Sequence, residues 1–438
     1  MRKGQDRETT RHETRARATG DMAALEDSSQ GRTRDRRSVY ERYQEAPGEH
    51  FVSLDELFGR ETTSDGQPTD VEREVVEEGV DEITSPFDPE HIDIETRTTT
   101  VDLLISRLRN EMIDLAPDFQ RRAGIWTDEK QSRLIESLLL RIPIPSFYAA
   151  EQKDGSWAIV DGIQRLTSIA RFFDAQTVDA PPLRLKGLEY LRNFAGAGFH
   201  DLSGKLQIRL RETEVVVHVI RRGTPEPVMF NVFARINTGG EPLTRQEIRH
   251  ALIPGRSRTL LAELADSQEF RSATGYSVVG DRMADREMVL RFVAFRLTPP
   301  DGYRNGDFDG FLADAMHRIN RFDPADEEHL RYEFTSAMTA AQTIFGVHAF
   351  RKFRSGQQRK SPINKALFET VAVNLAGLAP FQHDRLRQLD ALDAFADLME
   401  DTEFERSISV ATGDPKKVRK RFEAVQELFE DLLEHGDA

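Results

Sequence analysis

One short stretch combines residue types that could bind an anion. Residues 157–173 read "WAIVDGIQRLTSIARFF", in which an apolar run ends at Asp161 and Gly162 and a helical pattern begins at once. Gly162 has no Cβ, so a ligand could approach the backbone closely. Gln164 and Arg165 fall in the first helical turn, where free N–H groups and a partial positive charge favour anions. The pattern predicts a phosphate site; the alternative is an ordinary helix start whose Arg165 pairs with a carboxylate such as Asp161.

A second cationic stretch lies upstream, in "PDFQRRAGIW" at residues 117–126. Gln120 and Arg121 fall in a predicted loop that leaves a short strand, from which an arginine could reach a phosphate. The alternative is that Arg121 and Arg122 face solvent or form salt bridges. Trp126 is expected to anchor the core.

The third stretch is "FARINTGGEPLTRQEIRH" at residues 233–250. Asn237, Thr238, Gly239 and Gly240 predict an open turn between two helices, because adjacent glycines permit positive φ and close backbone approach. Arg235 flanks this turn, which is either a further part of the phosphate site or a simple helical corner. His250, farther along, is either a packed residue or a base.

The elements that must position these residues follow from hydrophobic periodicity. One helical face is formed by the apolar residues of 101–108, and another by those of the helix that begins at Thr127 or Asp128. Two strands flank a Lys-Asp-Gly turn before Asp161, and "ETEVVVHVI" is a further strand. Thr244 and Glu247 have the spacing of a capping box. We therefore predict the α+β class, with a mixed domain at residues 96–255 and a helical domain at 256–438.

The charge is distributed unevenly along the chain. The 438 residues carry a net charge of −15, and residues 46–100 hold sixteen acidic residues against three arginines. High charge without apolar periodicity predicts a disordered, charged N-terminal tail over residues 1–95. We expect removal of residues 1–90 to leave the melting temperature nearly unchanged.

A basic segment stands out against this acidic background. Residues 348–365 hold six arginines or lysines with two interleaved phenylalanines. We predict DNA-phosphate contacts by Arg351, Lys352, Arg354, Arg359 and Lys360. The alternative is a mobile basic loop between helices.

Composition excludes several classes of chemistry. The sequence has no cysteine, which excludes disulfides, thiolate zinc sites and cysteine nucleophiles. No run of about 18 apolar residues could span a membrane, and the N-terminus lacks the apolar segment of a secretory signal. We expect a cytoplasmic protein that does not contact a membrane.

Four motifs together resemble a known family. The stretches "DFQRRAGIW", "SRLIESLLLRIPIP", "VDGIQRL" and "FARINTGGEPLTRQEIRHAL" occur in order within about residues 86–320. They are similar to the N-terminal domain of GmrSD-type (type IV) restriction endonucleases, which belongs to the ParB/sulfiredoxin-like superfamily. The family hallmark Asp-Gly-Gln-Gln-Arg falls on residues 161–165, with Ile163 in place of the first Gln. The Gln-Arg element falls on Gln120 and Arg121, and the Arg-Ile-Asn-Thr-Gly-Gly element on residues 235–240.

The resemblance implies a nucleotide-binding sensor of a prokaryotic anti-phage restriction system. A nucleoside triphosphate with Mg²⁺ would bind between the three motifs, with Asp161, Gln164 and Arg165 in the chemical roles and Glu136 as a further acid. The resemblance also implies NTP hydrolysis. The Ile163 departure bears on hydrolysis if the missing Gln positions the attacking water, and phosphate binding survives the departure. The family's His-Asn-His nuclease motif is not found here, so a separately encoded nuclease subunit is expected. The alternative is a ParB-like DNA-binding adaptor without turnover, and sulfiredoxin chemistry is excluded because it needs cysteine.

Overall fold

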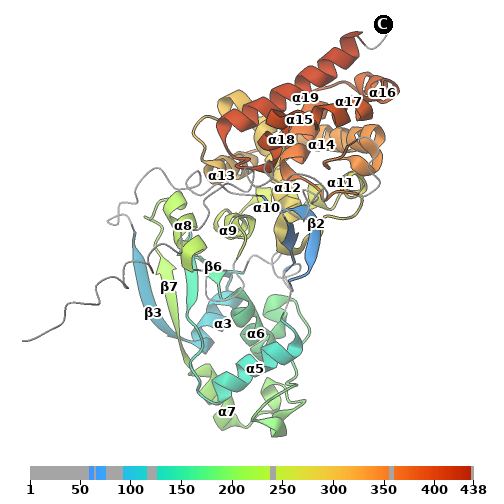
Figure 1. Ribbon diagram of the computed structural model, residues 1–438. Coiled ribbons are helices and arrows are strands. Elements are labelled where there is room, and N and C mark those ends of the chain that lie inside the picture. Colours follow the sequence, from blue (N-terminus) through green and yellow to red (C-terminus); the bar gives the residue numbers. More distant parts are fainter. Residues whose placement is uncertain are drawn as a thin grey trace, which may run out of the picture. The chain divides into compact units, whose positions relative to one another are not determined.

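The computed structural model describes residues 59–63, 66–74, 92–115, 126–236, 243–354 and 360–435 (Figure 1). A five-stranded mixed sheet with helices on both faces occupies the part of the chain up to about residue 254, and the remainder is helical. The predicted α+β class is confirmed.

The sheet has the strand order β3-β7-β5-β6-β4. Its strands are β3 (Ile94–Thr100), β4 (Ile113–Asp114), β5 (Phe147–Glu151), β6 (Trp157–Asp161) and β7 (Glu214–Ile220). The β5–β6 hairpin and β7 were predicted from the sequence and are present. The pairs β3–β7 and β5–β6 are antiparallel, whereas β5–β7 and β4–β6 are parallel. Strand β6 is hydrogen-bonded to β4 over its first residues and to β5 along its length, and Asp161 at its end pairs with Tyr148 of β5.

Each face of the sheet is covered by a different group of helices. One face packs its valines and aromatic residues against α3 (Val101–Arg109), α5 (Asp128–Leu139), α6 (Ile163–Phe173) and α7 (Gly204–Arg211). The opposite face packs Ala150, Val160 and Ile220 against α8 (Glu226–Ile236) and α9 (Arg245–Leu252). Burial on both faces accounts for the nearly continuous apolar run that precedes Asp161.

The predicted helix starts are present. Thr100 and Thr127 each accept a backbone N–H with the side chain at the N-cap of α3 and α5. Thr244 and Glu247 form the predicted capping box of α9. Such caps satisfy amides that the helix itself leaves unpaired, which is why these starts are readable in the sequence.

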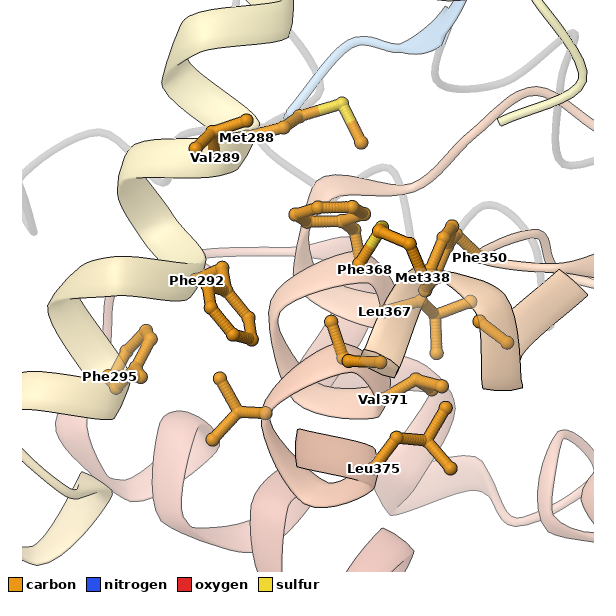
Figure 2. Close-up of a cluster of buried hydrophobic side chains, with 14 of the residues drawn as sticks. Met288, Val289, Phe292, Phe295, Met338, Phe350, Leu367, Phe368, Val371 and Leu375 are labelled. Atoms are coloured by element: carbon orange, nitrogen blue, oxygen red, sulfur yellow. The ribbon is translucent and has the colours of Figure 1, made fainter. Parts of the chain in front are cut away.

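The C-terminal part is helical and surrounds one large core. Its helices are α10 (Arg256–Ala265), α11 (Gln268–Ala273), α12 (Ala284–Leu297), α13 (Phe308–Ile319), α14 (Pro324–Phe345), α15 (Lys365–Ala376), α16 (Pro380–Gln388), α17 (Ala391–Leu398), α18 (Thr402–Ser409) and α19 (Pro415–His435). Figure 2 shows side chains of α12 and α15 meeting in this core, among them Phe292 and Leu367. The ring of Phe292 also packs edge-on against Phe334, with centroids 5.1 Å apart.

A short hairpin precedes the sheet and corrects the tail prediction. Strands β1 (Arg60–Thr62) and β2 (Pro68–Glu72) are antiparallel. Val71 is buried, and the backbone of β2 forms two hydrogen bonds with Ile363, both 2.8 Å long. The Glu72 amide donates to the Ile363 carbonyl, and the Ile363 amide donates to the Asp70 carbonyl. The expectation of disorder throughout residues 1–95 is therefore wrong for the hairpin and for β3; residues 1–58 and 75–91 lie outside the described residues.

Candidate functional site

The turn between β6 and α6 has a backbone that only glycine fits. Gly162 has φ of +95°, and a Cβ at this position would lie 2.5 Å from Cδ1 of the buried Phe147 ring. No side chain caps the N-terminus of α6. Glycine at this position makes room for the Phe147 ring, and the uncapped first amides of α6 are an arrangement suited to an anion.

Arg165 does not extend into solvent from this turn. Its guanidinium is 9% exposed, lies over the Phe147 ring, and donates from Nη2 to Asp161 Oδ2 at 2.9 Å and to the Ser146 carbonyl at 3.2 Å. This is the pairing with Asp161 that the sequence left as the alternative. The Asp161 side chain is 36% exposed, so its carboxylate is partly open to solvent, whereas the Arg165 side chain that pairs with it is buried.

Gln164 connects the turn to the neighbouring helix α5. Its side chain is half-buried, and its Oε1 accepts the Trp126 backbone N–H at 3.4 Å. Trp126 packs against the core of the α5–α6 face, as predicted, and its carbonyl accepts from Gln131 at 2.6 Å. Ile163, by contrast, is buried in the core below the sheet. Residue 164 therefore supplies the amide side chain of this turn, and residue 163 supplies packing.

The other two predicted motifs lie only partly within the described residues. Gln120, Arg121, Asn237, Thr238, Gly239 and Gly240 lie outside them. Arg235 is exposed in the last turn of α8. The described flanks nevertheless adjoin the sheet, because Trp126 contacts Gln164 and Leu243 packs against the cores on both faces.

Glu136, proposed as a further acid, has a structural role instead. It is 3% exposed and accepts three backbone N–H groups, from Glu189, Tyr190 and Leu191, at 2.7–3.0 Å. Burial opposes its charged form, but the three amide donors outweigh burial and lower the pKa of the carboxyl. Glu136 thus fastens the chain near Tyr190 to α5.

Two of the four described cations of the predicted DNA-binding patch are buried. Arg351 is 1% exposed and bonded to Asp70 at 2.8 Å, and Lys352 is bonded to Glu72 at 2.6 Å. These two cations neutralise strand β2 and cannot reach a phosphate in this conformation. Arg354 and Lys360 are exposed, and Arg359 lies outside the described residues. The acidic and basic segments, which the sequence suggested were a tail and a DNA site, are each other's partners.

His250 is buried in α9, and neither of its ring nitrogens has a hydrogen-bond partner among the described residues. Burial, together with the positive charges of Arg258 and Arg286, lowers the pKa of His250 to about 2. His250 is therefore a neutral packed residue, one of the two alternatives.

No group of three or more histidine, aspartate or glutamate side chains in the described residues is placed to hold a metal ion. No described helix is long and apolar enough to cross a membrane.

Residues 102–254 match the family model described as the N-terminal domain of the GmrSD restriction endonuclease. This match confirms the resemblance drawn from the four sequence motifs. Neither the curated proteins nor the solved structures contain a significant match.

Proposed function

The domain at residues 102–254 belongs to the GmrSD restriction endonuclease N-terminal domain family, and from that premise we propose that the chain is the nucleotide-binding sensor of a restriction system. Its target would be modified or foreign DNA, and a separate nuclease subunit would cut it. The ParB-like DNA-binding adaptor without turnover is the competing function.

The observation that supports nucleotide binding best is the Gly162 turn. A phosphate there would receive backbone N–H groups from the first turn of α6, whose N-terminus no side chain caps. Arg165 acts as a positioning residue, since it holds Asp161 and the Ser146 carbonyl in place. Gln164 lies in the same helical turn, where its amide could orient a water or a phosphate oxygen.

The residues present also fit a magnesium ion. Mg²⁺ at nucleotide sites typically uses one or two carboxylates together with the phosphates, and Asp161 is a partly exposed carboxylate at the edge of the turn. When bound, the ion would neutralise phosphate charge. Asp161 would hold it, and the buried Arg165 would keep the carboxylate oriented.

Calorimetric titration with ATP, GTP, CTP and UTP, with and without Mg²⁺, tests this proposal. Asp161→Asn keeps the shape of the side chain but removes its charge, so Mg²⁺-dependent affinity should fall about tenfold, equivalent to about 1.4 kcal/mol. Binding without Mg²⁺ should change little. The control is Asp397→Asn, which removes an exposed carboxylate from α17.

Binding of none of the four nucleotides by the wild-type protein would sink the proposal. Phosphate release, measured with and without a DNA duplex, separates the two functions. Release that DNA stimulates supports a sensor with turnover. Nucleotide binding without release supports the adaptor.

A further inference from the structure

A second candidate site lies away from the Gly162 turn. A cavity of about 470 Å³ opens among the β1–β2 hairpin, α9, α12 and α13. Neither Asp161, Gly162, Gln164 nor Arg165 lines it. Seven arginines or lysines line the cavity against four acids, although the chain as a whole is strongly acidic. Acids just behind the lining, Asp70, Glu247 and Glu369, also pair with Arg60, Arg282 and Arg291. The positive charge open to an anionic ligand therefore comes from the exposed Arg73 and Arg245.

The buried wall of the cavity holds preoriented arginines. Arg249 of α9 is 2% exposed and forms an ion pair with Asp309. Arg291 of α12 is also buried and pairs with Glu74 and with Glu287. Carboxylates hold both guanidinium groups in place, so a ligand would not have to order flexible side chains when it binds.

The more exposed wall supplies the excess charge. Arg245 pairs with the same Asp309 as Arg249, so one carboxylate is shared between two guanidinium groups. The side chain of Arg245 is 53% exposed, and Arg73 is also exposed. These two arginines can turn toward a ligand without disturbing the core.

The cavity also has an apolar wall. Phe308, Leu312 and Ala284 line it, and Phe308 is half-buried. Organic ligands generally occupy pockets of about 300–1,000 Å³ with an apolar lining and a few fixed polar groups. A volume of about 470 Å³ therefore suits a ligand of mononucleotide size.

We propose that this cavity binds a mononucleotide-sized organic phosphate. Its phosphate groups would contact Arg73, Arg245 and Arg249, because guanidinium forks match phosphate oxygens bidentately. Its organic body would pack against Phe308. The site is separate from the one proposed at Gly162, so either can fail alone.

The test is calorimetric titration of the intact chain with ATP, tripolyphosphate, adenosine and a 12-base-pair duplex. The double variant Arg73→Gln/Arg245→Gln removes two exposed charges from the cavity. Its matched control, Arg133→Gln/Arg184→Gln, removes two exposed arginines that lie elsewhere. We expect ATP affinity at this site to fall at least tenfold in the cavity variant and to be unchanged in the control.

The remaining ligands and variants identify the source of the binding. Tripolyphosphate should compete with ATP, and adenosine, which lacks phosphate, should bind far more weakly. ATP binding lost only in Asp161→Asn, and not in the cavity variant, would overturn this inference while leaving the proposed function intact. Duplex binding lost in the cavity variant, without any loss of ATP binding, would also overturn it. If Arg73→Gln/Arg245→Gln fails to fold, Arg73→Gln alone, at an exposed position, should still weaken ATP binding.

Discussion

The Gly162 turn and the β1–β2 hairpin both bring carboxylates against guanidinium groups, but they differ in burial. At the turn, one acid, Asp161, meets one arginine and is itself 36% exposed. At the hairpin, three acids at alternate positions, Asp70, Glu72 and Glu74, pair with Arg351, Lys352 and Arg291. Both side chains of the Glu72–Lys352 pair are less than 10% exposed, whereas Asp70 and Glu74 are 24% exposed beside buried arginines. A charge that is partly exposed can exchange its partner for a ligand, whereas a fully covered pair is committed to the fold.

The electrostatics of the hairpin cluster agree with this distinction. Burial opposes the charged form of Glu74, but Arg291 outweighs it and lowers the pKa of the carboxyl. Replacing a buried ion pair by apolar residues can be neutral, yet removing one partner leaves an uncompensated charge and costs about 3–5 kcal/mol. Deleting the hairpin while Arg351, Lys352 and Arg291 remain should therefore lower the stability more than replacing both members of each pair.

The largest effect should come from deleting the hairpin. A chain that lacks residues 1–74 loses the acidic partners of Arg351 and Lys352 and one of the acids that pair with Arg291, and we expect its melting temperature to fall by more than about 10 °C. The matched control lacks residues 1–58, because the described contacts of the hairpin begin at Gly59. Differential scanning calorimetry compares the two.

Equal melting temperatures for the two deletions would show that the hairpin is dispensable. The original expectation for a charged tail would then hold despite the buried pairs. A chain without residues 1–74 that folds and binds DNA more tightly would instead show that β2 covers a nucleic-acid surface.

An intermediate effect is expected at Gly162. Gly162→Ala must accept a positive φ, which costs roughly 1–2 kcal/mol, and must also displace the buried Phe147 ring, for about 1–3 kcal/mol more. Gly155→Ala is the matched control, because Gly155 has a φ of +83° but no atom within 4 Å of the added Cβ. Urea unfolding of both variants separates the backbone strain from the overlap. Equal losses of stability would show that Phe147 yields freely.

Local patterns predicted the parts of this molecule that local physics determines. The caps at Thr127 and Thr244, the β5–β6 hairpin and the Gly turn all depend on residues a few positions apart. The sequence also raised the pairing of Arg165 with Asp161, because the two residues flank the Gly162 turn only four positions apart.

Long-range pairing could not be predicted in this way. Asp70 and Arg351 lie 281 residues apart, so the acidic and basic segments gave no local sign that they neutralise each other. Strand β3 was not predicted. Its threonines lie on a partly exposed surface, so the strand lacks the alternating apolar residues by which a strand is recognised in a sequence. The cationic cavity also draws its arginines from three separated segments of the sequence.

The smallest effect concerns His250. This buried group has no acidic partner in the described part of the chain, so it tests whether a buried side chain can carry a charge without one. Its side chain is 1% exposed, and its pKa is lowered to about 2 from the usual 6.5. Below pH 6.5 the unfolded chain therefore binds a proton that the folded chain does not. Stability should fall as the pH drops, with a slope approaching about 1.4 kcal/mol per pH unit, and His250 should contribute no pH dependence above pH 6.5.

Urea unfolding between pH 6.5 and pH 5 measures this contribution. Over that interval the wild-type protein should lose about 1.5 kcal/mol through His250, and His250→Gln should lack this part of the slope. His200→Gln, at an exposed histidine, should keep it. Because each protein is compared with itself across pH, any fixed cost of the substitution cancels. If the free energy of unfolding changes with pH equally in all three proteins, the folded chain protonates His250 readily. A buried charge in this protein would then not need a carboxylate partner such as those that the hairpin supplies.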